Sequence, residues 1–129
     1  MAADYEANRR VRRTMLRDLV LGSCVAPDGR YDLKLADVVW AICEETSWLL
    51  PQNNPLTLGR KGLPLPDPYS HRVDAAAAET AADLALAVQM AASRLDAVST
   101  QLYERIELKT ILFNSRVIII RNNHIISSN

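Results

Sequence analysis

The chain has 129 residues, and its 15 basic and 15 acidic side chains leave a formal net charge of zero. This length accommodates one domain with a modest core and excludes two ordinary domains. The balanced charge excludes a general electrostatic attraction to nucleic acid or to an anionic membrane, so we expect neither as a partner.

Cysteines and histidines give no sign of a metal or cofactor site. Cys24 and Cys43 lack the CxxC spacing of a zinc site and are too few for a disulfide framework, which predicts buried, unreactive thiols. His71 and His124 have no third ligand at a metal-like spacing. We therefore expect no metal and no cofactor.

The start of the chain and its apolar stretches bear on localisation. The opening MAADYEANRRVRR lacks the apolar segment of a secretory signal. No stretch reaches the roughly 18 uninterrupted apolar residues of a membrane-spanning helix. The sequence thus predicts a cytoplasmic protein.

The first predicted helix covers residues 4–21. It lacks Gly and Pro, it places Val11, Met15 and Leu19 at helical spacing, and Gly22 follows as a stop signal. The helix also carries a basic patch that is flanked by acidic residues and contains no interleaved aromatic residues, so we interpret it as a solvated outer face and not as a nucleic-acid surface. The patch consists of Arg9, Arg10, Arg12, Arg13 and Arg17.

The second predicted helix covers residues 33–48, after a Pro-Asp-Gly turn and with Asp32 as its cap. Its apolar residues fall on nearly all sides, which is typical of a helix that is buried all round. Five of the six prolines then lie between Pro51 and Pro68. This density excludes regular structure and indicates a functional loop or a linker, and the leucines within it favour a loop with apolar anchors.

Two more helices are predicted. Residues 73–98 are rich in alanine, with Asp74 or Glu79 suited to the first turns. A fourth helix begins near Ser99, a plausible cap, and extends to about residue 113. The predicted fold is therefore all-α, with four main helices and one long Pro-rich loop. In the tail, Val117 to Ile120 suit a short strand for which no partner is evident, so either the partner lies outside the chain or the tail is not part of the fold.

Two pairs of acidic residues are candidates for function. On a continuous helix Glu44 shares a face with Trp40, Ser47 and Trp48, whereas Glu45 points about 100° away. A carboxylate beside an aromatic surface is typical of a sugar site and also of a helix end held by ordinary hydrogen bonds. The i, i+4 pair formed by Glu79 and Asp83 indicates either solvation or pairing with an arginine.

Three blocks of the sequence, in matching order, resemble a known family. They are DVVWAICEETSWLLPQNN, then LPDPYSHRVDAAAAETAADLALA, then RLDAVSTQLYERI. Together, over about residues 31 to 108, they resemble the N-terminal helical region of the heparinase II/III family of polysaccharide lyases.

The resemblance implies a fold and a reaction. Residues 1–114 would form part of an incomplete α/α toroid built from helical hairpins, and residues 115–129 would be an atypical tail outside the family pattern. The family cleaves uronic-acid-containing polysaccharides, such as heparin, heparan sulfate or alginate, by β-elimination. Its catalytic groups lie further along the family sequence, so the resemblance assigns no catalytic residue here and implies that this chain alone is inactive.

The resemblance also implies substrate contacts and leaves one rival interpretation. The loop at 46–72 would lie near the polysaccharide cleft. Where the family continues after Pro51 to His-Asn, this chain has Gln52-Asn53-Asn54, so no histidine role is carried over. The rival is a small helical protein-interaction module whose second helix binds a partner, and exposed apolar helix faces could support self-association. The candidate sugar contacts are Glu44, Trp48, Asn53 and Asn54.

Overall fold

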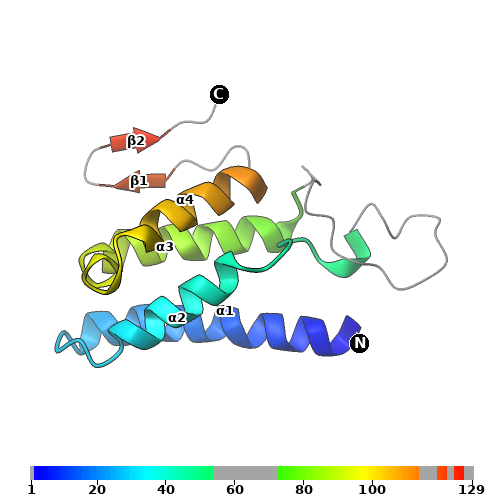
Figure 1. Ribbon diagram of the computed structural model, residues 1–129. Coiled ribbons are helices and arrows are strands. Elements are labelled where there is room, and N and C mark those ends of the chain that lie inside the picture. The colour runs from blue at the N-terminus through cyan, green and yellow to red at the C-terminus, as the bar shows by residue number, and fades with distance from the viewer. Residues whose placement is uncertain (1, 54–72, 114–118, 122–123, 127–129) are drawn as a thin grey trace.

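The computed structural model describes residues 2–53, 73–113, 119–121 and 124–126 (Figure 1). The predicted all-α fold with four main helices is confirmed. Most of the Pro-rich loop, including Asn54 and His71, and residues 114–118 lie outside the described residues. The helices are α1 (Ala2–Val25), α2 (Asp32–Cys43), α3 (Ala75–Val98) and α4 (Gln101–Phe113), joined by a 3₁₀ turn, η1 (Pro51–Asn53), and followed by strands β1 (Ile119–Arg121) and β2 (His124–Ile126).

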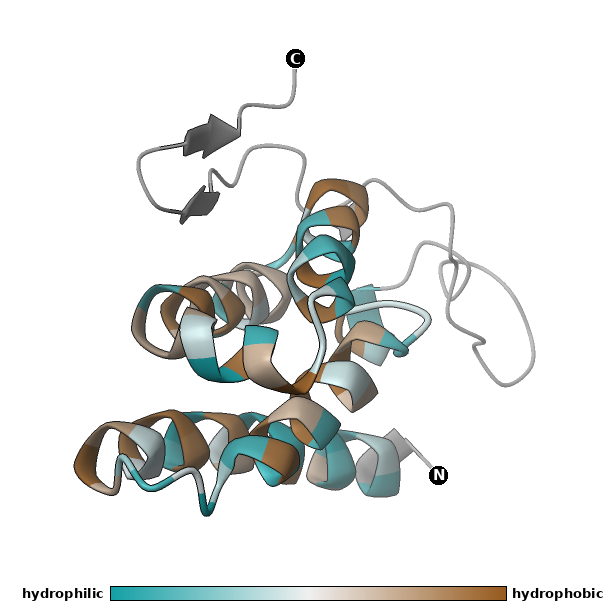
Figure 2. Ribbon diagram, turned by 60° about the vertical axis from the view of Figure 1, so that its left-hand side comes forward, coloured by the Kyte–Doolittle hydropathy of each residue, from teal (hydrophilic) through white to brown (hydrophobic). Residues whose placement is uncertain are grey.

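The four helices form two antiparallel hairpins, α1 with α2 and α3 with α4 (Figure 1). The hairpins stack with their first helices, α1 and α3, packed against each other and their second helices, α2 and α4, packed against each other. Helix α3 also contacts α2 and therefore touches all three other helices. Both apolar and polar residues occur around every helix (Figure 2), which is expected where a helix has neighbours on more than one side.

One hydrophobic core joins all four helices. The large buried side chains come from every helix, while α3 contributes mainly alanines, whose small side chains let three neighbours approach it. The core of α1 is Leu16 and Val20. Of the three residues whose spacing predicted the helix, Val11 is exposed, and Met15 and Leu19 are only partly buried. The remaining core residues include Leu35, Val39, Ile42, Trp48, Ala77, Ala81, Leu84, Ala87, Val88, Leu102 and Ile106.

Gly22 does not end the first helix, contrary to the prediction. Helix α1 continues through it to Val25, two residues before Pro27. A Cβ atom at Gly22 would lie 3.3 Å from the Tyr31 ring, so the glycine leaves room for that aromatic side chain. The turn glycine is Gly29, with φ of 81°.

Helix α2 differs from the prediction at both ends. Tyr31 and not Asp32 occupies the N-cap position, and the Asp32 carboxylate instead accepts a hydrogen bond from Arg94 at 3.0 Å. The helix ends at Cys43 and does not reach Trp48. It is also not buried all round, because Leu33 is 72% exposed and Trp40 is 47% exposed.

The predicted strand has its partner within the chain. Strand β1 pairs antiparallel with β2, with Ile119 opposite Ile126 and Arg121 opposite His124. The alternative in which the partner strand lies outside the chain was therefore wrong. The second strand gives little signal in the sequence, because a run of only three residues is close to the shortest length that forms a strand.

Asp74 connects the start of α3 to the segment after α2. Its carboxylate caps α3 by accepting from the Ala77 backbone N–H at 2.8 Å, and it also accepts from Leu50 N–H and Asn53 Nδ2, each at 2.9 Å. Burial disfavours the charged form, but the hydrogen bonds from Asn53, Leu50 and Ala77 outweigh it, so the pKa of Asp74 lies below its ordinary value.

We expect Asp74→Ala to lower the free energy of unfolding by about 1–2 kcal/mol at neutral pH, through loss of the cap and its tertiary bonds. Because the folded-state pKa is depressed, this contribution is present above the ordinary pKa of 3.8 and is lost as the pH falls below it. Urea unfolding at several pH values measures the difference. Asp18→Ala, an exposed change on α1, is the control, and a gap between wild type and Asp74→Ala that persists undiminished at the lowest pH would contradict the assignment.

Candidate functional site

The segment from Glu44 to Asn53 contains every described candidate contact, and it lies at the end of the molecule where α1 and α3 begin (Figure 1). Helix α2 stops at Cys43, so the residues after it turn away from the helix axis and do not continue its faces. Their positions are set by contacts with α1 and α3. These contacts decide which candidate side chains are exposed.

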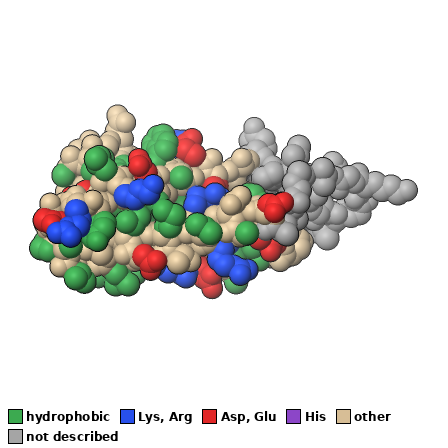
Figure 3. Space-filling model, turned by 90° about the horizontal axis from the view of Figure 1, so that it is seen from below, with side chains coloured by type: hydrophobic (Ala, Val, Ile, Leu, Met, Phe, Trp, Pro, Cys, Tyr) green, Lys and Arg blue, Asp and Glu red, His purple; other side chains and the backbone are tan. Residues whose placement is uncertain are grey.

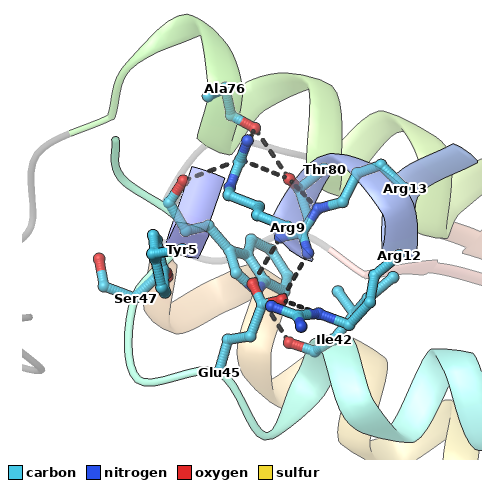
Figure 4. A network of polar contacts seen from close by, with 10 residues as sticks. Tyr5, Arg9, Arg12, Arg13, Ile42, Glu45, Ser47, Ala76 and Thr80 are labelled. Carbon is cyan, nitrogen blue, oxygen red and sulfur yellow. Dashed lines mark hydrogen bonds and ion pairs between the residues drawn. The ribbon is translucent and has the colours of Figure 1, made fainter. Parts of the chain in front are cut away.

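Glu45 attaches this segment to α1. Its carboxylate receives two hydrogen bonds from Arg13, from Nη1 and Nη2 at 2.6 Å each, and a third from Arg12 Nε at 2.7 Å (Figure 4). The side chains of Arg13 and Glu45 are almost completely buried, at 6% and 7% exposure. A bidentate pair of this kind is the strongest arginine–carboxylate geometry.

Arg9 joins the same segment to α3. Its Nη2 lies within hydrogen-bond distance of the Trp48 carbonyl at 3.1 Å, the Ala76 carbonyl at 2.9 Å and Thr80 Oγ1 at 3.2 Å (Figure 4). Arg13 Nε also donates to Thr80 Oγ1, at 3.2 Å. Burial lowers the pKa of Arg9, and the neighbouring charge of Arg13 lowers it further. We call Arg9, Arg12, Arg13, Glu45 and Thr80 the arginine cluster.

The arginine cluster corrects the prediction of a solvated basic face. Arg9 and Arg13 are buried. Arg17 donates to both carboxylate oxygens of Asp83 at 3.0 Å, which confirms the prediction that an arginine could pair with this acid. The lower face of the molecule correspondingly shows basic, acidic and hydrophobic side chains interspersed, and no broad basic field (Figure 3). A sequence signal existed, because Arg9, Arg13, Leu16 and Val20 recur at helical spacing on the buried face of α1.

Glu44 is exposed and pairs with Arg105 of α4, whose Nε donates to the carboxylate at 3.0 Å. The Arg105 guanidinium lies 5.4 Å from the centre of the Trp40 ring. The predicted combination of a carboxylate and an aromatic surface therefore exists, with Trp40 as the aromatic residue. An arginine already occupies the space between them, so the arrangement is also an ordinary tie between α2 and α4.

Trp48 lies in the core and not on the surface. Its side chain is 0% exposed, and its indole N–H donates to the Ile42 carbonyl at 3.1 Å. A sugar ring needs an open aromatic face to stack on, and Trp48 offers none in this structure. The prediction assumed that the helical face of Trp40 continued to residue 48, but α2 ends five residues earlier.

Asn53 is exposed in η1, and its amide nitrogen donates to Asp74 at 2.9 Å. Its side-chain oxygen accepts no hydrogen bond from another described residue, so it is suited to accept from a sugar hydroxyl. Asn54 lies outside the described residues. Of the four candidates, Glu44 and Asn53 are thus the two that the structure places at the surface.

The remaining chemistry of the described residues is limited. Cys43 is buried, and burial raises the pKa of its thiol to about 12, whereas Cys24 is exposed, so the expectation of two buried thiols holds for Cys43 alone. No cluster of three or more potential metal ligands occurs in the described ranges. Within those same ranges, every helix is too short or too polar to cross a membrane.

The chain was compared with known protein families, proteins and structures. No family model, no curated protein and no solved structure matches the chain.

Adjacent glutamates test the importance of the arginine cluster. Glu45→Gln leaves the buried charge of Arg13 without its carboxylate, and we expect it to lower the free energy of unfolding by about 2–4 kcal/mol. Glu44→Gln breaks a half-exposed pair and should cost less than about 1 kcal/mol. Urea denaturation of both variants at neutral pH measures the two costs. Equal costs for the two glutamates would show that the cluster has no special role.

The two tryptophans can be separated by fluorescence. With Trp40→Phe, the remaining Trp48 should emit at shorter wavelength and be quenched weakly by acrylamide, because its indole is buried. With Trp48→Phe, the remaining Trp40 should emit at longer wavelength and be quenched strongly. Circular dichroism checks that both variants keep their helices, and strong quenching of Trp48 in a folded Trp40→Phe variant would contradict its place in the core.

Proposed function

We propose that the chain is part of a polysaccharide lyase that cleaves uronic-acid-containing polymers by β-elimination. The observation that carries the proposal is the stacking of two helical hairpins with like helices side by side, because an α/α toroid is built by repeating this step. Exposed apolar residues on the second hairpin, including Leu86 and Met90 of α3 and Leu108 of α4, give a following hairpin surface to cover. The sequence blocks quoted above supply the choice of family.

In this proposal the residues of the chain bind polymer and do not perform the elimination. Glu44 and Asn53 are exposed on the segment that follows α2, and they present a carboxylate and an amide to sugar hydroxyls. The arginine cluster and Asp74 fix the backbone that carries them. Such preorganisation favours binding because little conformational freedom is lost on contact.

Affinity electrophoresis of the 129-residue chain tests the proposal. Gels containing alginate or heparan sulfate should retard the chain, and a gel containing neutral dextran should not. Asn53→Ala should weaken the retardation about fivefold, the equivalent of one hydrogen bond of about 1 kcal/mol. Gln52→Ala, on the same exposed turn, is the matched control and should behave as wild type.

Thermal unfolding confirms that the Asn53 variant is folded, since Asn53 also bonds Asp74. The polymer concentration in the gel is varied to extract the affinity. Equal mobility in the acidic and neutral gels at every concentration would overturn the assignment to polysaccharide.

A second candidate function is a helical protein-interaction module. The observation that favours it is the exposure of two large apolar side chains on α2, Leu33 and Trp40, on the side away from the core. Exposed apolar side chains grouped on one helix mark interaction sites more often than scattered ones.

A further inference from the structure

The outer side of α2 carries an ordered pattern of exposed residues, of which Trp40 and Glu44 contact α4 through Arg105. Helical spacing places them on one side of the helix, and all are exposed. Along the helix the pattern is an apolar residue, a basic residue, an acidic residue and an apolar residue. We call this surface the α2 face, and it consists of Leu33, Lys34, Asp37 and Trp40, with Ala41 and Glu44 completing its C-terminal end.

The charges of the α2 face are available for a partner. Among the residues that the structure describes, neither Lys34 nor Asp37 takes part in an ion pair. Glu44, by contrast, is already paired with Arg105. The charges that a partner would have to match are therefore one positive and one negative, three residues apart.

We propose that the α2 face binds the same face of a second copy of the chain, in an antiparallel arrangement about a two-fold axis. A two-fold axis perpendicular to α2 reverses the order of the pattern. Lys34 then faces Asp37 of the partner subunit, Asp37 faces Lys34 of the partner subunit, and the apolar ends, Leu33 and Trp40, meet one another. The pattern is thus self-complementary, which is the requirement for an isologous dimer.

The same pattern disfavours other arrangements of two copies. A parallel arrangement in register would place Lys34 against Lys34 of the partner subunit and Asp37 against Asp37 of the partner subunit, and like charges in contact are unfavourable. An unrelated partner would have to supply the complementary order by itself. A second copy supplies it because it has the same sequence.

Contacts within the chain restrain the Trp40 side chain before a second copy binds. The Arg105 guanidinium lies over its ring at 5.4 Å, and Arg105 is itself fixed by Glu44. A restrained aromatic side chain loses little rotamer freedom on binding, which suits it to act as an interface anchor. The dimer does not depend on the proposed polysaccharide binding, and the two are measured separately.

Sedimentation velocity over a range of protein concentrations tests the dimer. The wild-type chain should show a concentration-dependent equilibrium between monomer and dimer. Lys34→Asp and Asp37→Lys each place like charges together at two symmetric points, so each should raise the dimer dissociation constant at least tenfold, about 1.4 kcal/mol. Circular dichroism and thermal unfolding confirm that each variant is folded.

Mixing the two variants gives the decisive measurement. In a heterodimer of Lys34→Asp with Asp37→Lys, the new carboxylates face the new amines, and the remaining Asp37 faces the remaining Lys34. The mixture should therefore dimerise about as well as wild type, although each variant alone does not. Gln89→Asp on α3 and Gln52→Lys on η1 are controls with the same kind of added charge at exposed sites, and they should leave the dimer unchanged.

Three results would overturn the proposal. They are a wild-type chain that remains monomeric at all concentrations, association that neither α2 variant weakens, and a mixture of the variants that stays monomeric. If association is lost in Leu108→Ser but kept in the α2 variants, the contact lies on α4 and the α2 face is not the interface.

Discussion

The buried pairing of Arg13 with Glu45 is the contact on which the arrangement of the chain depends. Helix α2 ends at Cys43, and Glu45 is the second residue after it, so this carboxylate returns the chain to α1. Arg9 lies one turn before Arg13 and holds the next part of the segment by donating a hydrogen bond to the Trp48 carbonyl. The same two arginines reach Thr80 of α3, so a single side of α1 joins the first hairpin to the second.

The electrostatics of the arginine cluster favour one arrangement over others. The guanidinium groups of Arg12 and Arg13 bind one carboxylate, that of Glu45. Burial and the neighbouring charge of Arg13 lower the pKa of Arg9. Among the described residues, the acceptors of Arg9 are two backbone carbonyls and Thr80 Oγ1, and no carboxylate forms an ion pair with it. A buried pair of this kind is weak evidence for high stability. It does penalise any arrangement in which Glu45 points elsewhere.

The existence of the four helices could be predicted from the sequence, whereas the positions of the key side chains could not, because they depend on tertiary contacts. Runs without Gly or Pro, and alanine in α3, favour helix regardless of neighbours, so α1 to α4 were predicted correctly. The end of α2 depends on tertiary contacts. The prediction continued the helix to residue 48, so it placed the side chains after Cys43 on the wrong faces. Glu45, predicted to point away from the candidate site, is the buried acid that holds the segment to α1, and Trp48, predicted as a sugar contact beside Glu44, lies in the core. The core spacing of Arg9 and Arg13 was visible in the sequence, but arginine is so seldom buried that the pattern was assigned to the surface.

Hairpin stacking also explains why the exposed apolar residues of the second hairpin and those of the α2 face have separate roles. A hairpin that followed the second one would pack against α3 and α4, where Leu86, Met90 and Leu108 are exposed. It would leave the outer side of α2 open, because α2 belongs to the first hairpin and already has α4 as its neighbour in the stack. The apolar residues Leu33 and Trp40 therefore need a different explanation from those of the second hairpin. The opposite charges of Lys34 and Asp37 provide that explanation, because they make the α2 face complementary to itself. A surface that another hairpin covers does not require such self-complementarity.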